Sequence, residues 1–177
     1  MVISVFLSLV SYVLLPGSNM QASTQVENVI RRELNKKFPG WKFVNIHKAI
    51  HKRLREHISK DALPNLIQED FDGNGQSDFA VYITHGRRSK EKDIIVALLK
   101  TGELFQLHIL NSVVSTSEQY PSEHYLMVAK KGSEGLDHET HKKFKYARAS
   151  IMEIIDGRGS ISYVYEKGKF RQIITGD

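Results

Sequence analysis

The pattern of hydrophobic and polar residues divides this chain into a short helical part and a longer strand-forming part. Residues 24–27 match a capping box, and apolar residues recur after them at helical spacing as far as Phe38. A second apolar stripe runs through the basic segment 49–59. The sequence therefore predicts two helices near the N-terminus, with a short strand at 41–46 between them.

From residue 65 onward, short apolar runs alternate with glycine-bearing turns, which is typical of β-strands joined as antiparallel hairpins. The run 94–99 is apolar at every position and predicts a strand that is buried on both faces. We therefore expect an α+β fold in which the two N-terminal helices pack on a twisted antiparallel β-meander of about seven or eight strands. The expected strands of the meander are 66–71, 79–84, 94–99, 104–110, 125–129, 149–155, 161–165 and 170–175.

The first fifteen residues carry no charge and are apolar except for three serines. This run is shorter than the roughly 18–20 apolar residues that span a bilayer. Pro16, Gly17 and several small residues follow it, so we expect a secretory signal peptide over 1–22, cleaved after Ala22, and a single mature domain over 23–177. No Lys or Arg precedes the run, and a wrongly chosen start or an uncleaved anchor is the alternative.

The chain has no cysteine, so neither a disulfide nor a lipid-anchoring cysteine is available. Together with the predicted signal peptide, this favours a bacterial protein that is periplasmic or secreted. We expect no stable membrane span once the leader is removed.

Basic residues exceed acidic ones by 25 to 20, which gives a formal net charge of +5. They concentrate at 87–92, 130–131 and 142–145, where they would contact an anionic polymer or simply form solvated hairpin tips. No nucleic-acid motif accompanies them, so we expect no specific nucleic acid partner. The expected partner is an unidentified protein or a polymer of the cell envelope.

One loop, residues 70–78, combines residue types that suggest chemistry. Asp70, Asp72, Asn74 and Asp78 place side-chain oxygens at positions 1, 3, 5 and 9, with glycine at positions 4 and 6. Gln76, at position 7, would supply its backbone carbonyl. Because Ca²⁺ prefers about six to eight oxygen ligands around one point, this spacing predicts a calcium site.

The loop does not continue as an EF-hand, because Val81 stands where the bidentate Glu would be and a strand follows it. Its residues, running directly into an apolar strand, resemble the calcium loops of integrin-type FG-GAP repeats and the related VCBS repeats, here in a single copy. The resemblance implies Ca²⁺ held by Asp70, Asp72, Asn74, the Gln76 carbonyl and Asp78, with water completing the shell. A metal-free polar turn is the alternative, since Asp, Asn and Gly are common turn residues.

Two further segments carry a broader resemblance. The segment Phe38-Pro39-Gly40-Trp41 and the ending at 160–173, an aromatic strand followed by a Lys-Gly-Lys turn, resemble small uncharacterised bacterial exported proteins. That group implies a leader and a single acidic loop, and it implies no activity.

Catalytic motifs are not evident in the sequence. His47 and His51 have the spacing of a zincin, but Lys48 stands where the catalytic Glu is required. We therefore interpret them, and the pair His138 and His141, as solvated histidines. The leading hypothesis is an exported, non-catalytic domain with structural calcium that serves as a binding module of the cell envelope. The alternative is a metal-dependent hydrolase of an anionic substrate, so enzymatic activity is left open.

Overall fold

The computed structural model describes residues 18–60, 62–87, 90–115 and 120–176. Within these ranges the chain forms two helices and eleven strands, and it is mainly antiparallel β. Residues 1–17 of the predicted signal peptide over 1–22 lie outside the described residues, and the expected cleavage point after Ala22 falls inside the first helix. No helix in the described part is long and apolar enough to cross a membrane. The helices are α1 (Ser18–Asn35) and α2 (Lys48–His57).

The first sheet has five strands, with β3 near its centre. β3 pairs with β4 along one edge and with both β1 and β2 along the other, and β5 pairs with the far side of β4. All of these pairings are antiparallel. The strands are β1 (Lys42–Phe43), β2 (Leu66–Glu69), β3 (Asp78–His85), β4 (Lys92–Thr101) and β5 (Leu104–Val114).

The second sheet has four antiparallel strands in the order β11-β10-β9-β6, and β7 and β8 form a separate two-stranded hairpin. The hairpin is inserted in the chain between β6 and β9, so it leaves the second sheet and returns to it. These strands are β6 (His124–Ala129), β7 (Glu134–Asp137), β8 (Lys142–Lys145), β9 (Ser150–Ile155), β10 (Gly159–Glu166) and β11 (Lys169–Gly176).

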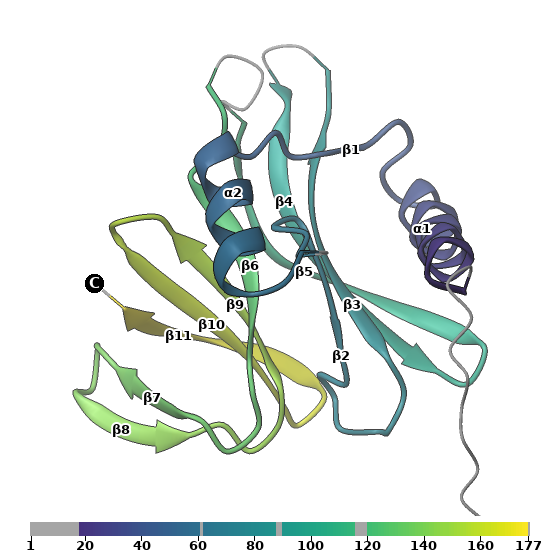
Figure 1. Cartoon of the computed structure of the whole chain (residues 1–177). Helices are drawn as coiled ribbons and strands as arrows, with labels where there is room; N and C mark the ends of the chain where they lie inside the picture. The colour runs from purple at the N-terminus through teal and green to yellow at the C-terminus, as the bar shows by residue number, and fades with distance from the viewer. Residues whose placement is uncertain (1–17, 61, 88–89, 116–119, 177) are drawn as a thin grey trace, which may run out of the picture.

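The elements stack as successive layers, with α1 on one side of the first sheet and the second sheet on the other (Figure 1). One hydrophobic cluster joins α1 to the first sheet through residues such as Ile30, Leu34 and Val96. A second cluster lies between the two sheets and includes α2 residues. A third, smaller cluster lies between the second sheet and the hairpin. Both faces of β3 and β4 are therefore covered.

The expected architecture of two helices on one meander is wrong. The chain builds two sheets and a hairpin, and only α1 covers the outer face of the first sheet, while α2 borders the core between the sheets. The physical reason lies in β3 and β4, which are buried along almost their whole length. Strands that are apolar on both faces need cover on both faces, and here a second sheet supplies it.

Candidate metal centre

The acidic loop connects β2 to β3, two strands that pair directly with each other. Its turn depends on Gly73 and Gly75, whose φ angles of 79° and 82° are readily adopted only by glycine. The preceding strand ends at Glu69 and the following one begins at Asp78, so Glu69 and Asp78 lie opposite each other in the ladder. The hairpin pairing therefore closes the loop on itself.

The loop brings three carboxylates together. Asp70, Asp72 and Asp78 each offer a carboxylate oxygen, and these oxygens all lie within 4.8 Å of one another. Oxygens that share one cation at 2.3–2.6 Å are separated by distances of this order. Because three negative charges at this separation repel one another, a cation between them would be stabilising. This group can hold a metal ion.

Backbone N–H groups fix the first two carboxylates. Asp70 accepts hydrogen bonds from Gly73 N at 2.8 Å, Asn74 N at 3.1 Å and Gly75 N at 2.9 Å. Asp72 accepts one from Asn74 N at 2.9 Å. A carboxylate oxygen has two lone-pair directions, so such bonds orient the group without using all of its capacity to bind a cation.

Asp78 is fully buried and ties the loop to the neighbouring strand. One of its oxygens accepts from Phe71 N at 2.8 Å and Asp72 N at 3.3 Å, and the other accepts from Lys100 N in β4 at 2.7 Å. Burial raises the pKa of Asp78 above its ordinary value, and the nearby charge of Asp72 adds to this, although the backbone hydrogen bonds act in the opposite direction. A bound cation would favour the charged form.

Asn74 and Gln76 are placed differently from the three aspartates. The Asn74 amide donates to Asp72 Oδ2 at 3.0 Å and to the Lys100 carbonyl at 2.7 Å, while its oxygen accepts from Gln76 N at 2.7 Å. The Gln76 side chain faces the backbone of Gly102. Asn74 therefore anchors the loop to the end of β4. Coordination by its oxygen and by the Gln76 carbonyl stays a prediction.

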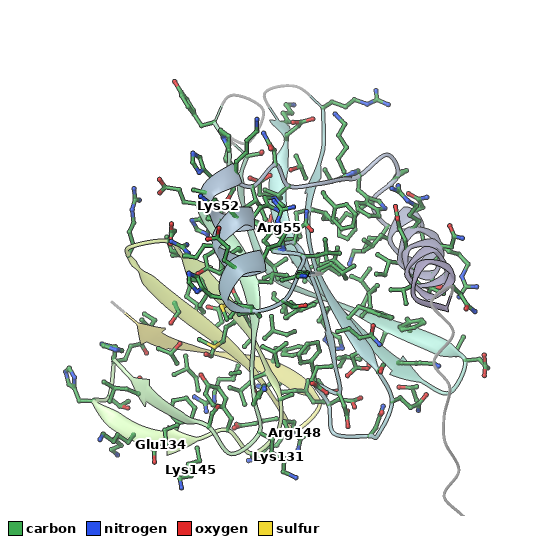
Figure 2. The ribbon with its side chains drawn as sticks, viewed as in Figure 1. Lys52, Arg55, Lys131, Glu134, Lys145 and Arg148 are labelled. Carbon is green, nitrogen blue, oxygen red and sulfur yellow. The ribbon has the colours of Figure 1, made fainter. Side chains whose placement is uncertain are left out.

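Arg148 approaches the loop from the connection that leads into β9. Its guanidinium donates a hydrogen bond to the backbone carbonyl of Asp72. Figure 2 shows Arg148 at the end of the molecule where the β2–β3 connection turns. The loop is thus held by the first sheet and by a side chain from the connection between β8 and β9. The sequence analysis missed this residue, because nothing local marks an arginine that contacts a carbonyl 76 positions away.

The histidines have other roles. His47 is the N-cap of α2, where its Nδ1 accepts from Ala49 N at 3.2 Å. His138 and His141 lie at the turn between β7 and β8. His108 packs edge-on against Tyr165 and Phe170, and its buried Nε2 has no hydrogen-bond partner among the described residues. Burial lowers the pKa of His108, so its neutral form is favoured.

A second polar cluster lies between the two sheets. The buried Glu153 of β9 accepts from Tyr163 Oη at 2.6 Å and Asn111 Nδ2 at 3.1 Å, and its other oxygen lies 2.7 Å from His124 Nδ1. Burial alone would raise the pKa of Glu153, but these three hydrogen bonds outweigh it, and its pKa lies below the ordinary value. The one sequence signal was a single carboxylate within an apolar strand, which usually indicates an exposed position.

The two clusters differ in what they can do. Glu153 already has neutral or cationic partners around both oxygens, which suits a structural link. The three aspartate carboxylates are held by backbone N–H donors and the amide of Asn74, and the Arg148 guanidinium contacts the Asp72 backbone carbonyl and not a carboxylate, so the carboxylate oxygens suit a hard cation that prefers oxygen ligands. Zinc prefers nitrogen and sulfur ligands and fits this donor set poorly.

No family model, curated protein or solved structure matches the chain.

Proposed function

We propose that the chain is an exported, non-catalytic domain that binds Ca²⁺ in the β2–β3 loop, where the ion serves a structural role. The observation that carries the proposal is the convergence of three carboxylates within 4.8 Å in a loop with an all-oxygen donor set. Ca²⁺ accepts carboxylate and carbonyl oxygens in irregular geometry, whereas Mg²⁺ demands a nearly regular octahedron and retains water. Calcium is therefore the cation that suits a loop of this kind.

A structural role follows from how the loop is held. Asp78 is fully buried and Asp70 accepts three backbone N–H bonds, so the ligands are fixed before any ion binds. The loop leads directly into β3, whose side chains are buried in the core, and an ion there would hold the two ends of the loop together. Export is supported by the apolar run at 1–15. It also fits a structural calcium site, because extracellular modules typically bind Ca²⁺ with a Kd of about 10⁻⁴–10⁻³ M. As such a module, the domain would bind a protein or polymer of the cell envelope.

The test is the melting temperature of the protein with Ca²⁺ or with a chelator. At ten times Kd the ion should stabilise the fold by about 1.4 kcal/mol, a shift of roughly 3–6 °C. Asp72→Asn should lose most of this shift, and Glu139→Gln, an exposed change of equal charge in the β7–β8 turn, should keep it. An Asp72→Asn protein that responds like the wild type would refute the site. Calcium-dependent turnover that disappears in Asp72→Asn would favour a hydrolase.

A further inference from the structure

The hairpin β7–β8 and the outer face of the second sheet border an open pocket of about 370 Å³. Ala129 of β6, Met152 of β9 and Tyr146 contribute an apolar lining, and Thr175 of β11 adds a hydroxyl. Pockets that bind small molecules have this combination of an apolar lining with few polar groups, and volumes from about 300 Å³ upward. The pocket is a different site from the acidic loop, since none of the three aspartates lines it.

The aromatic wall of the pocket is fixed by its neighbours. The ring of Phe144 lies directly over Gly135, where an added Cβ would be only 2.5 Å from Phe144 Cζ. Phe144 and Tyr146 contact each other edge to face, with ring centroids 4.9 Å apart. Tyr146 Oη is held 2.6 Å from Oγ of the buried Ser162. Because these contacts set the orientation of both rings, the space beside them is preformed.

The polar side of the pocket carries the ammonium group of Lys130 and the carboxylate of Glu134. Lys130, Ser133 and Glu134 complete its lining on the connection into the hairpin. Glu134 is engaged by Lys145, with Nζ and Oε1 4.0 Å apart, and Figure 2 shows both residues on the hairpin. Lys130 has no carboxylate within ion-pair distance in the described part of the chain, and the adjacent Lys131 adds a second positive charge.

We propose that this pocket binds a small amphiphilic anion, a carboxylate with an aliphatic body, independently of the calcium loop. The aliphatic body contacts Ala129, Met152 and the ring of Tyr146, which removes apolar surface from water. The carboxylate faces Lys130 at the entrance, where an ammonium group without a protein counter-ion gives a charge-assisted hydrogen bond. A neutral or cationic molecule of the same shape gains the first contribution and lacks the second.

The test uses octanoate as the probe and side-chain methyl groups as reporters. The full chain is labelled with ¹³C at its methionine methyls and isoleucine δ1 methyls, and the peaks of Met152 and Ile95 are assigned by Met152→Leu and Ile95→Val variants. Met152 lines the pocket, whereas Ile95 of β4 is buried in the core between the two sheets and is the internal control. Octanoate should shift the Met152 peak saturably and leave Ile95 in place. 1-Octanol should bind at least about fivefold more weakly, and octylammonium more weakly still.

Two variants locate the charge and the body of the ligand. Lys130→Gln should weaken octanoate binding by at least about fivefold and leave 1-octanol unchanged. Lys143→Gln, the same charge change at an exposed position of β8, should stay within about twofold of the wild type. Ser133→Phe, at an exposed position of the lining, should fill the pocket and abolish the Met152 shift, with the Ile95 peak reporting that the fold is retained. The proposal is overturned if octanoate gives no saturable Met152 shift in the wild type, or if Lys130→Gln and Lys143→Gln have equal effects.

Discussion

The guanidinium of Arg148 donates a hydrogen bond to the backbone carbonyl of Asp72 and so ties the connection between β8 and β9 to the acidic loop of the first sheet. Gly73 permits this approach, because a Cβ at that position would lie 3.2 Å from Arg148 Nη1. A glycine that the sequence marks as a turn residue therefore also makes room for a contact from the connection between β8 and β9. The acidic loop is a junction between the layers as well as a candidate ion site.

The first prediction concerns that junction. Arg148→Ala should lower the free energy of unfolding by about 1–2 kcal/mol, because it removes a charged donor from a carbonyl that is partly buried. Urea denaturation measures the change. Arg158→Ala is the matched control, since Arg158 is largely exposed and contacts Glu123 only at 3.5 Å. The free energy of unfolding of Arg158→Ala should fall by less than about 0.5 kcal/mol. Equal losses in the two variants would show that the Asp72 contact stabilises the fold no more than an exposed ion pair does.

The second prediction separates the structural work of Asp78 from calcium binding. When a chelator is present, Asp78→Ala should still lower the free energy of unfolding by roughly 3 kcal/mol, because the N–H groups of Phe71, Asp72 and Lys100 lose their acceptor. Glu69→Ala, its exposed neighbour across the ladder, should lose less than about 1 kcal/mol. A loss in Asp78→Ala that appears only when Ca²⁺ is present would assign Asp78 to the ion alone.

The third prediction is a pH dependence that arises from Glu153. Because its folded-state pKa lies below the ordinary value of 4.5, the stabilisation by its charged form is present above about pH 4.5 and is lost as the pH falls through the lower, folded-state pKa. At pH 7, Glu153→Gln should cost about 1–3 kcal/mol, since His124, Tyr163 and Asn111 face a neutral group instead of a carboxylate.

Denaturation at a series of pH values checks this expectation. The difference in stability between wild type and Glu153→Gln should shrink as the pH falls below about 4.5. A difference that stays unchanged at lower pH would mean that the carboxylate is not the stabilising form.

The fourth prediction tests the contact between Gly135 and Phe144. Gly135→Ala should destabilise the protein by about 1–3 kcal/mol, because the new Cβ would be 2.5 Å from the ring and the ring is packed against Tyr146. Calorimetry should show a melting temperature lower by roughly 2–10 °C. In a Phe144→Leu background the same Gly135→Ala change should cost much less. If the cost is the same in both backgrounds, the steric explanation fails.

Much of the strand pattern could be predicted from the sequence, because apolar runs and glycine turns are local signals. The runs at 79–84, 94–99 and 104–110 fall within β3, β4 and β5. The number of sheets could not be predicted in the same way. An apolar strand such as β4 indicates that both faces are covered, but its own residues do not say whether a helix or another sheet covers them.

The hairpin β7–β8 was missed for a different reason. Its strands contain mostly charged or small residues, and only Leu136 and Phe144 are large and apolar. A two-stranded ribbon with one polar face gives too few alternations to distinguish it from a loop. The first helix was predicted to start near Thr24, yet α1 begins at Ser18, since capping-box spacing also occurs within helices.

The candidate metal centre was predictable to the extent that it is local. Asp70, Asp72 and Asp78 converge because they share one short turn, and spacing alone suggested that. The side chain of Asn74 makes a contact that spacing could not show, because the Lys100 carbonyl belongs to the next hairpin. The cluster around Glu153 draws residues from β5, β6, β9 and β10, and only the folded chain brings them together.

The layered arrangement has a consequence for how the molecule opens. β3 and β4 are buried beneath α1 on one side and the second sheet on the other, whereas the hairpin β7–β8 rests on a single small cluster (Figure 1). We therefore expect the amide protons of the two middle strands to exchange with solvent only on global unfolding, and those of the hairpin to exchange by local opening at a lower free energy. Hydrogen exchange should then divide the chain into a slowly exchanging interior and a faster outer hairpin.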